Sequence, residues 1–106
     1  MISVLATITI PEGKRDEFLA IFKELVPKVL AEDGCIEYGP WVDLPTNINI
    51  QPPERKDVVV CVEKWESVEA LEAHLMAPHM LEFRKATEAL RLDIALQIIE
   101  PAQGVS

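Results

Sequence analysis

The residues of this chain that could take part in acid–base chemistry gather between Glu63 and His79. His74 and His79 are its two histidines, and a neutral imidazole can accept a proton from a phenol at neutral pH. Glu63 stands in an apolar, strand-like run, where a buried carboxylate must find a hydrogen-bond partner or keep its proton. These three residues are the candidate catalytic acids and bases.

Each of the three also has a purely structural interpretation. Glu63 could accept hydrogen bonds from a backbone amide or from Arg84, and histidines often cap helices or lie at the surface. His74 flanks the apolar stripe of its expected helix, so its ring can reach the space between helix and sheet. His79 follows Pro78 in the first turn of the next helix, where the helix dipole favours the neutral imidazole.

The candidate substrate-binding residues are aromatic. We expect Trp65 and Trp41 to face each other across two neighbouring strands, with Tyr38, Phe22 and Phe83 close by. A cavity lined by such side chains would suit a flat organic ligand, although the packing of an ordinary core would use the same residues.

The two histidines do not have the spacing of a metal site. They are separated by five residues instead of the four that place two ligands on one helix face, and no cysteine or carboxylate stands at ligand spacing beside them. Cys35 and Cys61 lie in apolar runs and are too few for a disulfide scaffold, so we expect buried, reduced thiols. No bound metal is expected.

Four runs of residues have the composition of β-strands, with abundant β-branched side chains and an alternation of faces. Gly39 and Pro40 in the second run indicate an edge strand or a bulge. In the third run, Glu63 and Trp65 share one face with Cys61. The strands are expected at residues 2–10, 35–42, 58–66 and 92–100.

Helical spacing of apolar residues predicts two helical regions between these strands. The first covers residues 14–32, with a kink or break before Pro27 and Gly34 as a left-handed C-terminal cap. In the second, Ser67 is a natural N-cap, and Pro78 begins a new helical segment. Its expected buried residues are Val68, Leu71 and Leu75, followed by Met80, Phe83, Thr87 and Leu90.

The resulting order, β-α-β-β-α-β, predicts an α+β, ferredoxin-like fold in which the helices cover one face of a four-stranded antiparallel sheet. One domain is expected over residues 1–106. The uncovered face would carry Val58, Val60 and Val62, and such an apolar face usually marks an association surface. We therefore expect a homodimer packed sheet to sheet. The connection at residues 43–57 is long for neighbouring strands, which is typical of a mobile loop, an oligomer contact or a binding lid.

Charge and hydropathy exclude several classes of partner. The net charge is −8 without a basic cluster, which disfavours nucleic acids and anionic membranes. No run of residues is long and apolar enough to be a transmembrane helix, and the first residues alternate Ile and Thr instead of forming a secretory leader. A cytoplasmic location is expected, and residues 101–106 are expected to form a short tail.

One segment resembles a known family. Glu63-Lys64-Trp65-Glu66-Ser67 is followed by Ala70-Leu71, His74-Leu75 and Pro78-His79, and preceded by Gly34-Cys35 with Tyr38 and by a strand that ends in Pro-Glu-Gly-Lys. This pattern, from Ile2 to about Glu100, resembles the antibiotic biosynthesis monooxygenase domain family, including its small quinol-monooxygenase-like members. The resemblance implies a dimeric ferredoxin-like α/β-barrel with a pocket between sheet and helices in each subunit. It also implies oxidation of phenols or hydroquinones by O₂ without a metal, flavin or haem cofactor.

Under this resemblance, Glu63 and Trp65 match the family's strand pair, and His74 and His79 match its helix histidines. Ala6 and Arg84 stand where haem-degrading relatives need an asparagine and a histidine, which disfavours haem degradation. The predicted function is cofactor-independent oxidation of a small aromatic hydroquinone or phenol by O₂ to a quinone. The alternatives are a non-catalytic dimeric module that binds a small metabolite, and an isomerase of a phosphorylated signalling sugar derivative.

Overall fold

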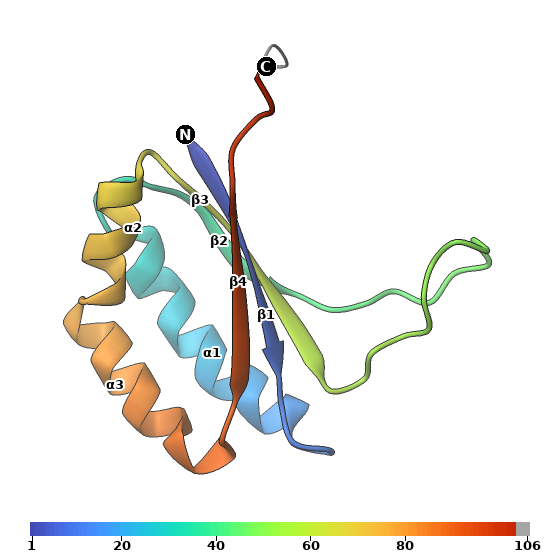
Figure 1. The fold of residues 1–106 in the computed structure, drawn as a ribbon. Coiled ribbons are helices and arrows are strands. Elements are labelled where there is room, and N and C mark those ends of the chain that lie inside the picture. Colours follow the sequence, from blue (N-terminus) through green and yellow to red (C-terminus); the bar gives the residue numbers. More distant parts are fainter. Residues whose placement is uncertain (104–106) are drawn as a thin grey trace.

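The computed structural model describes residues 1–103 and contains one sheet with helices on one of its faces (Figure 1). The strands are β1 (Ile2–Thr9), β2 (Cys35–Trp41), β3 (Val58–Trp65) and β4 (Asp93–Ile99). The helices are α1 (Arg15–Leu30), α2 (Val68–Leu75) and α3 (Pro78–Thr87), followed by the single 3-10 turn η1 (Glu88–Leu90). The sheet order is β2-β3-β1-β4 with every neighbouring pair antiparallel, which confirms the ferredoxin-like fold.

The core lies between the sheet and the helices because the strands alternate their side chains between two faces. On β1, Val4, Ala6 and Ile8 are buried on the helix side, opposite Glu63, Cys61 and Val59 of β3. On α1, the predicted stripe packs against them; its residues are Phe18, Phe22, Leu25 and Val29. The strand parity inferred from the sequence is therefore confirmed for β1 and β3.

The first helix differs from its prediction in two details. It continues through Pro27 without a break, and the amide of Ala31 donates to the Pro27 carbonyl. Because Pro27 lies in the last turn, the missing N–H removes one hydrogen bond close to an end that is already loosely held. Gly34 has the expected positive φ of 84°, but it belongs to the turn before β2, whereas the helix itself is capped by Ala31 in a right-handed conformation.

The second helical region begins and divides as predicted. The Ser67 hydroxyl accepts a 3.1 Å hydrogen bond from the Ala70 amide, and Pro78 opens α3. The predicted stripe of α2 is wrong at one position, because Val68 is 46% exposed. His74 is buried on this helix in addition to Leu71, so α2 turns its imidazole toward the sheet.

Strand β2 contains an irregularity that decides which of its side chains face the helices. Cys35 pairs with Trp65, but Glu37 pairs with Lys64, so Ile36 is an extra residue in the ladder. Such a bulge reverses the alternation beyond it. Trp41 consequently pairs with Val60 on the outer face, where it is 59% exposed, and the predicted facing of Trp41 and Trp65 is wrong.

The outer face of the sheet is apolar around Trp41, with Leu5, Val60 and Val62 beside it. The connection between β2 and β3 projects from this side as an arm (Figure 1), and the Asp43–Arg55 ion pair, with a 2.9 Å hydrogen bond, closes its base. Within the described residues no helix is long and apolar enough to span a membrane. The expected tail includes residues 104–106, which lie outside the described part of the chain.

Candidate active site

A cavity of about 140 Å³ lies between the sheet and the helices. Its floor is apolar and comes from the buried residues of β1, Val4, Ala6 and Ile8. The cavity reaches the surface between α3 and β4, because Ile94 and Leu96 point to the helix side of an edge strand that the helices leave uncovered. An apolar cavity with few polar groups is the usual form of a small-molecule site.

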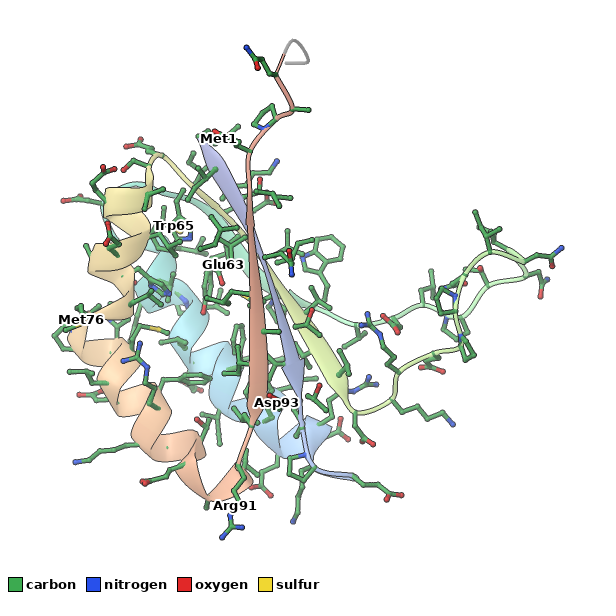
Figure 2. All side chains as sticks on the ribbon, viewed as in Figure 1. Met1, Glu63, Trp65, Met76, Arg91 and Asp93 are labelled. Carbon is green, nitrogen blue, oxygen red and sulfur yellow. The ribbon has the colours of Figure 1, made fainter. Side chains whose placement is uncertain are left out.

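Glu63 lies on the helix side of β3 and lines this cavity, as the strand parity predicts. It is 5% exposed and accepts a 2.9 Å hydrogen bond from the Trp65 indole N–H (Figure 2). Burial raises the pKa of the Glu63 carboxyl, and the indole N–H and His74 oppose the rise without cancelling it. The side chain can therefore keep a proton at a higher pH than an exposed glutamate does.

His74 also lines the cavity, and it is held from two sides. Its Nδ1 lies 2.8 Å from Oε2 of Glu32, and its ring centre lies 4.7 Å from that of Trp65. An ionised carboxylate can only accept, so Nδ1 carries the hydrogen and Nε2 of the neutral ring keeps a free lone pair. The side chain is 2% exposed, so the second ring nitrogen is shielded from bulk water.

His79 is near this site but does not line the cavity. Its Nε2 lies 2.6 Å from the same Oε2 of Glu32, so one carboxylate oxygen accepts from both imidazoles. On its other side, His79 lines a surface pocket with Glu24 and Glu82. Of the three predicted catalytic residues, Glu63 and His74 line the cavity. His79 does not line it and is connected to His74 only by their shared contact with Glu32.

Glu32 is the member of the site that the sequence did not reveal. It follows the C-terminal end of α1, 42 residues before His74, so no local spacing connects the two. One signal could have drawn attention to it. The C-terminal end of a helix carries partial negative charge, so an acidic residue there is unfavourable unless a donor group compensates it.

The convergence of Glu32, His74 and His79 also changes the interpretation of the metal-ligand spacing. A carboxylate does stand beside both histidines, although it comes from a distant part of the sequence. The ligating atoms of the three residues lie within 4.8 Å of one another. By its chemistry this set can hold a metal ion as well as a proton network.

The aromatic residues fall into three groups. Tyr38, Phe22 and Phe83 line the cavity, with Phe22 and Tyr38 stacked at a centroid distance of 5.7 Å. Trp65 is completely buried; its indole N–H donates to Glu63, and its ring packs against that of His74. Trp41 lies on the opposite face of the sheet and does not contribute to the cavity.

The remaining polar groups of the cavity are Arg84, Cys61 and the Tyr38 hydroxyl. Arg84 donates a 2.6 Å hydrogen bond to the Leu75 carbonyl and is exposed, so it lies at the mouth of the cavity and not on Glu63. Burial raises the pKa values of the Cys61 thiol and the Tyr38 phenol well above their usual range, so both stay protonated. Under ordinary conditions neither can serve as a base.

Three comparisons relate this chain to known proteins. A family model described as antibiotic biosynthesis monooxygenase matches residues 1–86. Over 103 residues the chain is 37% identical to the Escherichia coli K12 protein named "Probable quinol monooxygenase YgiN", covering 95% of this chain and 98% of that protein. A solved antibiotic biosynthesis monooxygenase matches with a TM-score of 0.76 at 25% identity, covering 96% of this chain and 99% of that one. A structure from Deinococcus radiodurans shares the fold, with a TM-score of 0.77 at 20% identity and coverage of 100% and 97%.

Proposed function

The chain belongs to the antibiotic biosynthesis monooxygenase family, and from this premise we propose that it oxidises a single-ring hydroquinone or phenol with O₂, without a metal, flavin or haem. Membership of this family and the sequence similarity to a protein named as a probable quinol monooxygenase support a monooxygenase role. The observation that carries the finer proposal is the apolar cavity in which one oriented imidazole, His74, lies with one buried carboxyl, Glu63.

The size of the cavity supports a single aromatic ring as the reacting part of the substrate. An apolar protein cavity of about 150 Å³ is known to accommodate benzene, and this one has about 140 Å³. Phe22 and Phe83 offer their rings to the flat faces of such a guest. Substituents on the ring can extend toward the open side between α3 and β4.

The first step of the proposed reaction is removal of a phenolic proton by Nε2 of His74. Glu32 holds Nδ1–H and stabilises the imidazolium that forms, as a carboxylate does in catalytic triads. His79 donates to the same oxygen and fixes the position of that carboxylate. The substrate is left as a phenolate in an apolar cavity, where it is a much stronger electron donor than the phenol.

The phenolate then gives one electron to O₂, which forms a substrate radical and superoxide inside the cavity. Their recombination joins one oxygen to a ring carbon as a hydroperoxide. Loss of that carbon's hydrogen as a proton and cleavage of the O–O bond place one oxygen in the ring as a carbonyl and release the other as water. A phenol with a free para carbon gives a quinone, and a hydroquinone gives a hydroxyquinone.

Glu63 is proposed as the acid that protonates the departing oxygen. Burial raises the pKa of its carboxyl, so a protonated form is available at a pH where exposed glutamates are ionised. Trp65 fixes the orientation of the carboxyl through its 2.9 Å hydrogen bond. The apolar surroundings exclude water that would otherwise quench the radical pair.

Oxygen uptake over a panel of single-ring hydroquinones and phenols tests this proposal. We expect turnover with one of them, an ¹⁸O₂-derived atom in the product by mass spectrometry, and no accumulation of hydrogen peroxide. Removing a general base typically lowers rates by about 10²–10⁴-fold, so His74→Gln should lose that much. His79→Gln, which removes an imidazole outside the cavity, should lose less, and Glu66→Gln provides an exposed carboxylate control for Glu63→Gln.

Two results would overturn the oxygenase proposal. Peroxide formed without ¹⁸O in the product would mean simple two-electron oxidation of the substrate. Saturable binding of an aromatic compound without any product would favour the non-catalytic binding module. The isomerase alternative receives little support from the cavity, because a phosphorylated sugar needs several cationic or amide donors and Arg84 is the one cationic side chain among the lining residues in the described part of the chain.

We also propose that two copies pack through the outer face of the sheet. Trp41 is exposed there beside Leu5, Val60 and Val62, and a large exposed aromatic on an apolar sheet face is typical of an association surface. In such a pair both cavities would remain accessible, because they lie on the opposite side of each sheet.

A further inference from the structure

Both histidines of this chain contact one carboxylate oxygen, Oε2 of Glu32. A single imidazole would be enough to accept the substrate's proton, and the shape of the cavity does not require a second imidazole at this oxygen. We propose that Glu32, His74 and His79 form a binding site for a divalent transition-metal ion, with Zn²⁺ as the ion it fits best. Two imidazoles and one carboxylate are a common protein ligand set for zinc, which tolerates a fourth ligand from water.

The geometry of the three side chains is close to that of a zinc site. Their donor atoms lie within 4.8 Å of one another, and Oε2 of Glu32 is 2.8 Å from Nδ1 of His74 and 2.6 Å from Nε2 of His79. Ligands on a tetrahedral zinc ion at about 2.0–2.1 Å are roughly 3.3 Å apart. Room for the ion therefore requires two adjustments: the carboxylate withdraws by about half an ångström or more, and the two imidazole nitrogens, which lie within 4.8 Å of each other, move closer together by side-chain rotation.

The backbone around the site also favours a cation. Glu32 follows the C-terminal end of α1, and His74 lies in the last turn of α2, so the negative ends of two helix dipoles meet at this point, against the positive end of one helix, α3, whose first turn holds His79. The surface pocket beside His79 contains Glu24 and Glu82 against one cation, Lys28. This pocket gives an ion a negatively charged approach to the partly exposed side of the site.

Zinc at this position would change the chemistry of the cavity, a consequence that rests on the proposed oxygenase function. A metal ion binds Nδ1 of His74 through its lone pair, so the ring hydrogen must move to Nε2. The cavity-facing nitrogen then becomes a donor and can no longer take a proton from a phenol. Zinc and the proposed catalytic base are therefore mutually exclusive states, and zinc should inhibit.

Binding is best measured on tag-free protein without substrate, by titration with Zn²⁺ and with Co²⁺, whose visible absorption reports its ligands. We expect one ion per chain, a thermal unfolding temperature that rises with zinc, and Co²⁺ bands without thiolate charge transfer. Glu32→Gln and His79→Gln should each weaken zinc by at least roughly tenfold, since even the loss of a supporting group outside the ligand set costs that much.

Two control variants lie beside the site. Asp33→Asn removes an exposed carboxylate next to Glu32, and Cys35→Ser removes a nearby thiol; both should bind zinc like the wild type. The proposal is wrong if the wild type shows no saturable single site, if Glu32→Gln and His79→Gln both bind as tightly as the wild type, or if Cys35→Ser abolishes binding. Because no substrate is used, these outcomes are independent of whether the oxygenase proposal holds.

Discussion

Replacing Gly34 with alanine tests how tightly α2 packs against the turn that precedes β2. Gly34 has a φ of 84°, and a Cβ added there would lie 2.6 Å from Cβ of Ala70 on α2. Gly13 has a similar φ of 78°, but an added Cβ would have no neighbour within 4 Å. The two glycines therefore have the same backbone requirement and differ in the space around them, which makes Gly13→Ala a matched control.

The expected magnitudes follow from these two differences. A left-handed conformation costs an alanine about 1–2 kcal/mol, partly offset by a less flexible unfolded chain, so Gly13→Ala should lower the unfolding free energy by about 1 kcal/mol. Gly34→Ala adds the clash with Ala70, and inserting a methyl group into packed surroundings costs about 1–3 kcal/mol more. Its total should be about 2–4 kcal/mol, and the unfolding temperature should fall by several degrees for each kcal/mol.

A double-mutant cycle measured by urea unfolding isolates the clash. Ala70→Gly alone should cost about 1 kcal/mol, because glycine weakens a helix. In the Ala70→Gly background, Gly34→Ala should cost no more than Gly13→Ala does. If Gly34→Ala costs the same with and without Ala70, or matches Gly13→Ala in the wild type, the close approach of α2 does not exist. Because His74 lies one turn beyond Ala70, Gly34→Ala should also reduce oxygen uptake more than Gly13→Ala.

Three further predictions follow from other residues. Burial raises the folded-state pKa of Glu63, so the contribution of this carboxyl to stability is complete below about pH 4.3, the unfolded value, and is lost as pH rises through the folded pKa. In urea unfolding, the wild type should therefore lose stability relative to Glu63→Gln from pH 4 to 8, and a constant difference between the two proteins would contradict this. Burial, and to a smaller extent the charge of Glu32, raises the pKa of the Cys35 thiol to about 11. A thiol reagent at pH 8 should therefore label Cys35 on the order of a hundredfold more slowly than free cysteine, and equal rates would contradict this. Trp41→Lys should shift the protein toward monomer in sedimentation, and a wild-type protein that is monomeric at micromolar concentration would refute the proposed packing.

The fold and part of the site follow from local patterns in the sequence. Alternation along β3 places Glu63 and Trp65 on the helix side, and the order of elements predicts the sheet that lies beneath them. Pro78 and Ser67 fix the start of two helices through backbone chemistry that needs no tertiary context. These features depend on residues close together in the chain, which is why they can be predicted.

Two features of the site depend on information that local patterns lack. The contact of Glu32 with both histidines joins the end of α1 to two later helices, and only the packed structure brings them together. Val68 was expected in the buried stripe of α2, but the helix is rotated to bury His74, whose Nδ1 gains a charged acceptor there. In both cases a polar contact between residues far apart in the sequence determines the arrangement, and no local pattern of apolar residues reports it.

The extra residue at Ile36 decides which side chains of β2 face the helices. Because the bulge takes up one residue, Tyr38 pairs with Glu63 on the helix side and Trp41 pairs with Val60 on the outer face. If the same residues paired without the bulge, every side chain after it would turn over, so that Tyr38 would leave the cavity and Trp41 would enter it. Deletion of Ile36 alone should leave Tyr38 in place, because it removes only the residue that has no partner in the ladder. The bulge, more than the identity of any residue, therefore determines which aromatic ring a bound molecule meets.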